Sequence, residues 1–357
     1  MLSISIIIIN WNYAAYLPIA VDSALAQTRS TDQVVIVDDG STDNSREIIA
    51  RYGSAVTGVL QPQGGHVRAM NAGYAASTGD LCIFLDADDY LYPNCVERVL
   101  DAWPEGAVKL QFRLDTIDRD GVDQAMPFPN IGPFLTPAAV LAQSLMSSWY
   151  PWTVSTGNAY SRAFLDGLMP IDAERIYRSP DGYLNKMAPL FGEVHSLSDI
   201  LGAYRVHGRN AWAQADGASS AGTALRWLNF DRALEGAFIE AAEAKNLKIR
   251  RPLIASLQQI EYRLQVVRFA PRQGPFPKDT AFSVWKEGLY SAARSPNFKW
   301  PGRILWWGWL TTMAFAPKSL LSRLAARGRL QAGRSGFWKK LLDIAKGRGA
   351  GAGPSKA

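Results

Sequence analysis

Two acidic clusters near the start of the chain hold the residue types best suited to chemistry. In the first, Val34–Val37 is followed by Asp38 and Asp39; in the second, Asp86 and Asp88 follow a run of apolar residues. An apolar run that ends in carboxylates is typical of a buried parallel strand, and ligands of open α/β sheets bind outside the carboxyl ends of the strands. The Asp-x-Asp spacing of the second cluster lets two carboxylates meet one hard divalent cation and the hydroxyls or phosphates around it.

Alternating strands and helices must position these carboxylates. The apolar runs and turn signals predict strands at Ile4–Ile9, Val34–Val37, Val56–Leu60 and Leu81–Leu85, and helices at Tyr16–Ala26, from about Ser45 to Tyr52, and at Val67–Ala76. Such alternation implies right-handed crossovers. We therefore predict an α/β fold with a mostly parallel sheet for the first part of the chain.

The rest of the chain divides by composition. Residues 106–215 are less regular and contain a proline-rich stretch. Ala224–Leu247 and Leu253–Phe269 contain few helix breakers and many good helix formers, and they predict a helical region over residues 216–298. We predict one catalytic domain over residues 1–215, with a first half at 1–105 and a second half at 106–215.

The net charge is divided unevenly along the chain. Residues 299–357 contain 12 Lys and Arg and one acid, Asp343, for a charge of +11, and the total is +6, so residues 1–298 carry −5. This argues against a nucleic-acid-binding body and indicates a tail that meets an anionic surface.

The stretch Ile304–Pro317 has 14 residues without a charge and contains Trp306, Trp307 and Trp309. A membrane-spanning helix needs about 20 apolar residues, and tryptophan favours the membrane interface. We predict that residues 299–346 form a basic, Trp-rich amphipathic segment that attaches to anionic lipid; the alternative is that the tryptophans pack on the protein. Residues 347–357 are rich in Gly, Ala and Pro and are predicted to be disordered.

The remaining composition sets broad limits. A hydrophobic content of 48% and a charged content of 20% exclude wholesale disorder. Cys82 and Cys95 have no metal or redox spacing and are expected to be reduced core thiols. The N-terminus lacks a basic region and a cleavage site, so we expect a first strand and not a signal peptide. These features predict a cytoplasmic protein, peripheral at the inner face of the cell membrane.

Four motifs in one order resemble those of the family 2 glycosyltransferases, which have the Rossmann-like GT-A fold. They are Ile6–Asn12, Val37–Asp43, Gly65–Asn71 and Gly79–Asp89. The resemblance covers about residues 4–100. It implies a GT-A catalytic domain that transfers a sugar from a nucleotide-diphosphate sugar, most readily a UDP-sugar, to an acceptor hydroxyl. It also implies Mg²⁺ or Mn²⁺ as cofactor and a place in bacterial polysaccharide or glycolipid synthesis. The basic tail suggests a glycan or lipid-linked acceptor at the cytoplasmic face of the membrane.

The resemblance also implies roles for single residues at the donor end. An aspartate can accept a hydrogen bond from a base N–H, and an aromatic ring can stack on the base. Asp88 would ligate the cation, while Asp86 would reach the ribose or the cation's waters. Many relatives have Arg before the Asn of the third motif, where this chain has Met70. The implied donor-binding residues are Asn10, Trp11, Asp38, Asp39, Gly65, Arg68, Asn71 and Asp86.

The second half supplies the acceptor end by the same resemblance. Asp181 lies where relatives carry Glu-Asp, which implies that it is the base of an inverting transfer. Asp172 and Glu174 are alternative acids. His207 lies in a Tyr-Arg-x-His motif, which implies that its neutral imidazole is a metal ligand.

Two other classes remain open at this point. A sugar-nucleotide pyrophosphorylase would carry a Gly-rich loop with Arg and Lys after its first strand, whereas this chain has Asn10–Ala15 there. A non-catalytic carbohydrate-binding or scaffold protein of the same fold would bind a nucleotide sugar without turnover.

Overall fold

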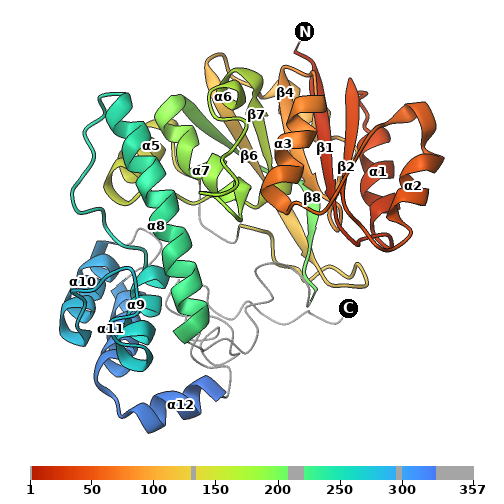
Figure 1. The fold of residues 1–357 in the computed structure, drawn as a ribbon. Coiled ribbons are helices and arrows are strands. Elements are labelled where there is room, and N and C mark those ends of the chain that lie inside the picture. The colour runs from red at the N-terminus through yellow and green to blue at the C-terminus, as the bar shows by residue number, and fades with distance from the viewer. Residues whose placement is uncertain (1, 130–133, 208–220, 295–299, 327–357) are drawn as a thin grey trace, which may run out of the picture. The chain divides into compact units, whose positions relative to one another are not determined.

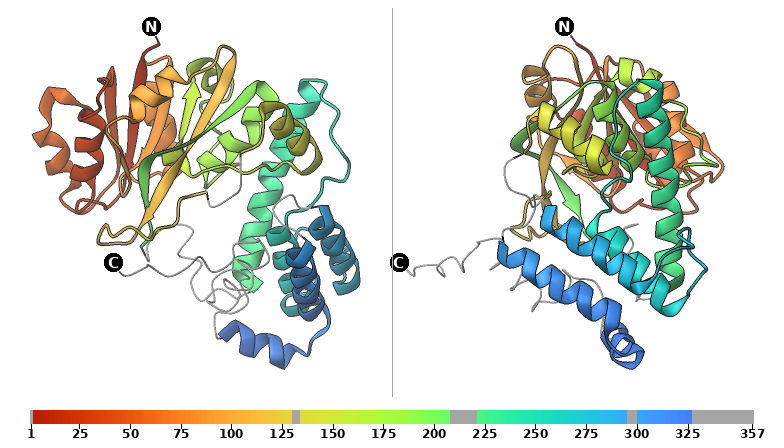
Figure 2. Two further views of the ribbon diagram at one scale, coloured as in Figure 1. Left: turned by 180° about the vertical axis from the view of Figure 1, so that it is seen from behind. Right: turned by 90° about the vertical axis from the view of Figure 1, so that its left-hand side faces the viewer.

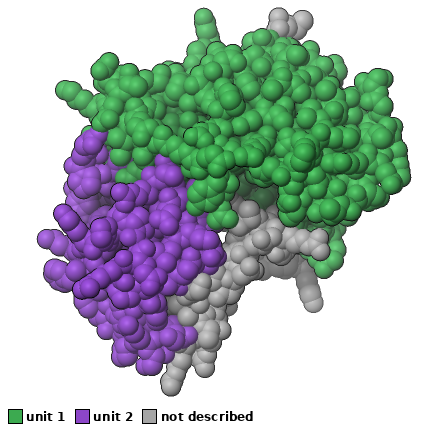
Figure 3. Space-filling model, viewed as in Figure 1, with its two compact units in different colours: residues 1–210, 234–249 green, residues 211–233, 250–357 purple. Residues whose placement is uncertain are grey.

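The computed structural model describes residues 2–129, 134–207, 221–294 and 300–326. The chain forms two compact units: residues 1–210 with 234–249, and residues 211–233 with 250–357 (Figure 3). The predicted boundary at residue 298 thus falls inside the second unit. Residues 327–357, which hold the predicted disordered tail and much of the predicted attachment segment, lie outside the described residues.

The first unit is built on a mixed sheet in the order β3-β2-β1-β4-β7-β6-β8-β5. β1 is parallel to β2 and β4, β2 is parallel to β3, and β7 runs antiparallel between β4 and β6. The two long strands β6 and β8 pair in parallel (Figure 2). The α/β fold with a mostly parallel sheet is confirmed. The strands are β1 (Ile4–Asn10), β2 (Gln33–Asp39), β3 (Thr57–Gln61), β4 (Leu81–Asp86), β5 (Tyr90–Leu91), β6 (Ala107–Ile117), β7 (Asn158–Ser161) and β8 (Glu193–Arg205).

Helices flank this sheet (Figure 1). In the first of them, Pro18 occupies the first turn, where a missing N–H has no intrahelical partner to lose. The buried residues Leu17, Ala20, Val21 and Ala24 recur at helical spacing and form its core face. The helices of this unit are α1 (Leu17–Leu25), α2 (Ser45–Arg51), α3 (His66–Ala76), α4 (Cys95–Asp101), α5 (Pro137–Ser147), α6 (Arg162–Asp166) and α7 (Pro180–Phe191), with 3₁₀ turns η1 (Gly53–Ala55) and η2 (Ser155–Gly157).

Strand register brings the two acidic clusters to one edge of the sheet. Asn10 pairs with Asp38, and Ile9 pairs with Asp86, so β1, β2 and β4 end side by side. Helix α3 packs closely on these strands. A Cβ at Gly73 would lie only 2.4 Å from Ile7 Cγ2, so this position has no room for a larger residue. The carboxyl edge predicted from the sequence is therefore where the polar groups collect.

The second unit is helical. Its core contains residues from four helices, among them Ile260, Val284, Leu310 and Leu321. Helix α8 contributes residues to both units. No helix in the described part of the chain has the length and apolarity needed to cross a membrane. The helices are α8 (Ala221–Ala244), α9 (Leu257–Phe269), α10 (Ala281–Arg294), α11 (Trp300–Phe315) and α12 (Lys318–Ala326).

The predicted attachment segment begins with α11, and the structure corrects part of that prediction. Trp306 and Trp309 are 8% and 5% exposed and belong to the core of the helical unit. The Trp309 Nε1–H donates to the Glu261 carboxylate. For these two side chains the alternative of packing on the protein is right, since a long apolar run can be buried in protein as well as in lipid.

Candidate active site

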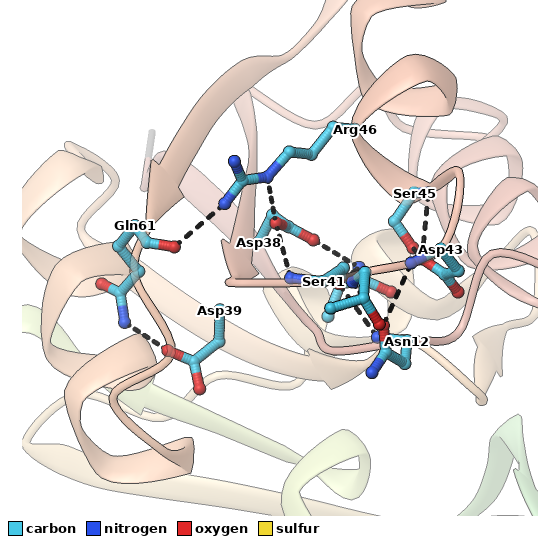
Figure 4. Close-up of polar contacts among 10 residues, drawn as sticks. Asn12, Asp38, Asp39, Ser41, Asp43, Ser45, Arg46 and Gln61 are labelled. Atoms are coloured by element: carbon cyan, nitrogen blue, oxygen red, sulfur yellow. Dashed lines mark hydrogen bonds and ion pairs between the residues drawn. The ribbon is translucent and has the colours of Figure 1, made fainter.

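The turn after β2 is fixed by side chains on both of its flanks (Figure 4). Gly40 has φ +73°, and a Cβ there would lie 2.4 Å from the Gln63 amide nitrogen. Asn12, with φ +57°, accepts the Thr42 N–H at its Oδ1 over 2.7 Å. Ser41 Oγ accepts the Asn12 N–H over 2.9 Å. The ends of β1 and β2 are thus locked to one another.

Asp38 lies at the base of this turn and is fully buried. It accepts hydrogen bonds from Asn10 Nδ2 at 3.0 Å and Arg46 Nε at 2.8 Å. Burial alone would raise the pKa of Asp38, but the hydrogen bonds from Ser41, Arg46 and Asn10 together lower it. Within the described residues the buried Asn10 Oδ1 has no hydrogen-bond partner. An unpaired buried acceptor costs about 1–3 kcal/mol, which an N–H of a bound ligand would offset.

Asp39 faces the loop that leads into α3. Its carboxylate accepts Gln61 Nε2 at 2.6 Å and the Gly64 and Gly65 amides at 2.8 Å each. Gly65 has φ +85°, a conformation that glycine adopts without strain. Asp39 therefore orders the loop before α3, and its contact with a donor stays a prediction.

The Asp-Ala-Asp-Asp turn after β4 is joined to the end of β8. Asp88 Oδ2 lies 2.8 Å from His207 Nε2, and the two side chains are 8% and 7% exposed. Arg205 donates from Nε to the Asp88 carbonyl at 2.9 Å and from its amide to Asp89 Oδ1 at 2.8 Å. Thr156 Oγ1 donates to Asp89 Oδ2 at 2.6 Å. Asp89 thus positions the turn, while Asp88 and His207, 119 residues apart in sequence, form a pair.

Two tyrosines before α1 hold the His207 ring. The Tyr16 ring is stacked on it with centroids 5.6 Å apart, and the Tyr13 ring meets it edge-on at 5.5 Å. The Arg205 guanidinium lies 4.6 Å from the centroid of the Tyr16 ring. The sequence analysis missed both tyrosines, because a Tyr-x-x-Tyr spacing in a loop carries no signal of a distant histidine.

Asp86 is the open carboxylate of the cluster, with 28% of its side chain exposed. His66 Nε2, at the start of α3, lies 3.7 Å from Asp86 Oδ1 and has no hydrogen-bond partner among the described residues. Burial raises the pKa of Asp86 well above its ordinary value, and the charges of Asp88 and Asp181 raise it further. Burial lowers the pKa of His66, against the opposing charges of Asp181 and Asp88.

Asp181 belongs to the same cluster. It lies in the first turn of α7 and accepts a hydrogen bond from Ser179 Oγ at 2.8 Å. Besides burial, the negative charge of Asp181 raises the pKa of Asp86. The same charge opposes the lowering of the His66 pKa that burial causes. The alternative acids point elsewhere: Glu174 is 83% exposed and pairs with Arg68 at 2.6 Å, and Asp172 accepts the Glu174 amide within its own turn.

The other predicted donor residues differ in their surroundings. Trp11 is 48% exposed, so it is not a core aromatic and its ring is open to a ligand. Arg68 instead pairs with Glu174. Asn71 exchanges two hydrogen bonds of 2.8 Å with the Ile171 backbone, which ties α3 to the loop before α7. The structure therefore gives Arg68 and Asn71 protein partners, and their donor contacts stay predictions.

Lys109 is a site residue that the sequence analysis missed. It is fully buried on β6, and its Nζ donates to Gln111 Oε1 at 2.9 Å, to Tyr150 Oη at 3.0 Å and to Asn185 Oδ1. Burial lowers the pKa of Lys109 well below its ordinary value, and the charge of Asp181 opposes this. Asn185 lies one turn after Asp181 on α7. Lys109 thus anchors the helix that carries Asp181. The one sign of this role in the sequence is a lysine within a run of strand-forming residues.

We expect Lys109→Met to destabilise the protein by about 2–4 kcal/mol, because it leaves Gln111 Oε1 and Tyr150 Oη buried without their donor and removes one of two donors to Asn185 Oδ1. Denaturant unfolding measures this loss. Lys186→Met is the matched control on the same helix, since Lys186 is half-buried and bonds to Ser148 Oγ at 2.9 Å; it is expected to cost less than about 1 kcal/mol. Equal stability of the Lys109→Met and wild-type proteins would contradict the anchoring role.

The side chains at this edge fit a divalent cation. Asp88 and His207 offer an oxygen and a nitrogen donor 2.8 Å apart beside the open Asp86 carboxylate. Burial, and after it the charges of neighbouring aspartates, raise the pKa values of Asp86 and Asp89, and a cation would relieve the repulsion between these charges. No three such side chains of the described residues already form a ligand set. Mg²⁺ is commonly held by one or two carboxylates together with substrate phosphates, so the remaining ligands would be diphosphate oxygens and water.

Comparisons with known proteins agree with this geometry. Residues 5–149 match the model of glycosyl transferase family 2. An uncharacterized glycosyltransferase of Nostoc sp. is 38% identical over 231 residues, which cover 61% of this chain and 69% of the relative. Chondroitin synthase of Pasteurella multocida is 43% identical over 100 residues, but that match spans 27% of this chain and a tenth of the relative. The structure of S. aureus TarS 1-349 with UDP-GlcNAc superimposes with a TM-score of 0.50 at 16% identity, over 97% of this chain and 92% of that one.

The chain therefore belongs to glycosyltransferase family 2 and is a glycosyltransferase. Its sheet domain has the GT-A fold, and a helical region follows it in the chain.

Proposed function

We propose that this enzyme transfers a sugar from a nucleoside-diphosphate sugar to an acceptor hydroxyl, with a divalent cation and with inversion at the anomeric carbon. The observation that carries the proposal is the pairing of Asp88 with His207 beside Asp86 at the carboxyl edge of the sheet, where the negative charge of Asp181 also acts. Asp86 ends β4 and Asp88 follows it, Asp181 lies in α7, and His207 follows β8, so the proposed site draws on three parts of the chain.

The donor would lie across the ends of β1, β2 and β4. The exposed Trp11 ring can stack on the base, and the unpaired Asn10 Oδ1 and the Asp38 carboxylate can accept its N–H groups. Asp86 would accept from the ribose. The TarS structure of the same fold holds UDP-GlcNAc, which supports a UDP-sugar as the first donor to test.

The transfer would be a single displacement. The acceptor oxygen forms a bond to the anomeric carbon while the bond from that carbon to the phosphate oxygen breaks, and the nucleoside diphosphate leaves with the electron pair. Asp181 takes the proton of the acceptor hydroxyl. Asp88 and His207 would hold Mg²⁺ or Mn²⁺, which when bound neutralises charge on the departing diphosphate. Inversion follows because the acceptor attacks from the face opposite the leaving group.

We expect Trp11→Ala to weaken donor binding about five- to 150-fold, since stacking of a base on an aromatic ring contributes about 1–3 kcal/mol. Titration calorimetry with the donor measures this change. Because Trp11 is half exposed, the variant should unfold at the wild-type denaturant concentration. Phe282→Ala removes an aromatic ring that is 59% exposed in the other unit and should bind the donor as the wild type does. Unchanged affinity in Trp11→Ala would argue against stacking.

The test of the reaction is release of nucleoside diphosphate from UDP-, GDP- and dTDP-sugars, with and without Mn²⁺ and with a glycan acceptor. The product's anomeric configuration is read by NMR. Cation-dependent release with inversion supports the proposal. A product of retained configuration would contradict the single displacement, and binding without any turnover would favour the non-catalytic alternative.

The setting of the reaction is part of the same proposal. The basic residues 299–346 would attach the enzyme to the anionic inner face of a bacterial cell membrane, where a lipid-linked glycan can serve as acceptor. The likeness to chondroitin synthase supports a polysaccharide or glycolipid product. Loss of membrane association on deleting residues 327–357 is the result we expect for the tail.

A further inference from the structure

The second unit exposes aromatic rings along one face of α10 and α11. This aromatic face consists of Phe282, Trp285, Trp300, Ile304, Trp307 and Phe315. Phe282, Trp300, Ile304 and Phe315 are 59%, 60%, 50% and 52% exposed. Large apolar side chains scattered singly on a surface are ordinary, but a contiguous group of them marks a contact surface.

The rings of the aromatic face form two contacting groups. The Trp285 centroid lies 5.6 Å from that of Phe282 and 5.4 Å from that of Phe315. Trp300 and Trp307 meet edge-on at 5.5 Å. Trp285 Nε1 also donates to Thr311 Oγ1 on α11, so the two helices hold one shared surface.

The opposite side of α10 is already used for packing. Val284, Gly288, Ser291 and Ala292 are buried. A Cβ at Gly288 would lie 2.7 Å from Ile260 Cγ2, so α9 and α10 pack closely there. The exposed rings of the aromatic face therefore form an apolar surface away from this packing, while its half-buried members Trp285 and Trp307 also pack against the core of the unit.

The polar atoms of two of these rings are satisfied within the protein. Trp285 Nε1 donates to Thr311 at 2.9 Å, and Trp307 Nε1 donates to the Leu289 carbonyl at 3.1 Å. These rings can enter an apolar layer without carrying an unpaired N–H into it, which would otherwise cost free energy.

Basic residues predominate in the part of the sequence that carries the aromatic face. Residues 281–326 contain six Lys and Arg and one acid, Glu287. Glu287 is 2.9 Å from the Arg263 guanidinium, so its charge is offset inside the unit. Lys286 on α10 and Lys318 on α12 are exposed. An anionic partner with an apolar layer below its charges fits both properties.

We propose that the aromatic face contacts an anionic lipid bilayer, with Phe282, Trp300 and Phe315 in the interfacial layer and Lys286 and Lys318 at the headgroups. The inference rests on the membrane attachment proposed above and extends it from the basic chain end to a folded surface on α10 and α11. A second copy is the poorer occupant, because an isologous interface would bring the same positive charges together.

The test is co-sedimentation of the full chain with vesicles of phosphatidylcholine alone or with added phosphatidylglycerol. Phe282→Ser combined with Phe315→Ser should weaken binding to anionic vesicles about tenfold or more, because two large apolar side chains no longer enter the interface. The matched control combines Ile19→Ser with Val122→Ser, which removes two side chains 46% and 59% exposed in the first unit. The control should bind as the wild type does.

A second variant tests the charges. Lys286→Gln combined with Lys318→Gln should weaken binding to anionic vesicles about thirtyfold at low salt, from about fivefold per lost charge. Wild-type binding to phosphatidylcholine alone should be weak. Binding to the two kinds of vesicle with equal strength, or full binding by the aromatic double variant, would overturn the inference.

Two further measurements keep the outcomes apart. If the wild type is a dimer without lipid and the aromatic double variant is a monomer, the aromatic face is a self-association surface and the inference is wrong. Sugar-nucleotide turnover without vesicles should be the same in all four proteins. Absence of turnover in the wild type would count against the proposed reaction. The vesicle measurements would still test the membrane contact of the aromatic face.

Discussion

Asp88→Asn is expected to lower kcat/KM for sugar transfer about a thousandfold in the presence of Mn²⁺. Asn keeps the volume of Asp but not its charge, and a lost cation–phosphate interaction of several kcal/mol corresponds to this factor. The fold should persist, because Arg205 Nε bonds to the backbone carbonyl of residue 88, which the substitution keeps. Steady-state release of nucleoside diphosphate measures the change, and denaturant unfolding checks the fold.

Asp120→Asn is the matched control for this variant. Asp120 is 75% exposed in a turn of the same unit and lies 3.6 Å from Arg119. The control should keep wild-type kcat/KM. A folded Asp88→Asn variant that kept more than about a tenth of the wild-type kcat/KM would have lost less than about 1.4 kcal/mol of transition-state stabilisation. Asp88 would then not hold an essential cation.

The second large effect is expected for Asp181→Asn. General-base catalysis contributes about 10²–10⁴-fold, so kcat should fall by roughly a thousandfold. Because Asp181 acts on the acceptor, the donor dissociation constant should stay within about threefold of the wild-type value. Pre-steady-state turnover together with donor titration separates the two quantities.

Glu174→Gln tests the assignment of the base. Glu174 is the alternative acid, it is 83% exposed, and it pairs with Arg68. Its loss should leave kcat unchanged, since an exposed ion pair contributes little. A large loss of kcat in Glu174→Gln, with Asp181→Asn nearly unaffected, would move the base to the loop before α7.

The first four strands were predictable because each is a short apolar run that ends in a turn signal. Leu81–Leu85 was predicted as a strand, and the structure has β4 at Leu81–Asp86. The second half of the sheet was not predicted. β6 and β8 mix polar and apolar residues, and their pairing contains register shifts, so no regular alternation reveals them.

The sequence motifs predicted the candidate site residues that they contain. The residues that hold these side chains by packing gave no signal in the sequence. The order of motifs placed Asp88 and His207 in one site, and the structure pairs them. Tyr16, which stacks on His207, and Thr156, which bonds to Asp89, reach these residues through the tertiary fold alone. Lys109 was missed for the same reason, since burial of a lysine depends on partners far along the chain.

In the C-terminal helices, hydropathy alone does not show whether protein or lipid covers an apolar run. Ile304–Pro317 has no charge, and an uncharged run reads the same whether protein or lipid covers it. In the structure Trp306 and Trp309 lie inside the helical unit, whereas Phe315 lies on the surface beside α10. Helical position, and not the composition of the run, decides which ring is covered.

The most direct test of the central claim is a calorimetric titration of UDP and GDP into the protein, with and without Mn²⁺, repeated on Asp88→Asn. The site at the ends of β1, β2 and β4 predicts that one nucleotide binds with Mn²⁺, and that binding is much weaker without the cation or in Asp88→Asn. Failure of both nucleotides to bind a folded sample, or equal binding in all four conditions, would contradict a cation-dependent donor site at Asp88.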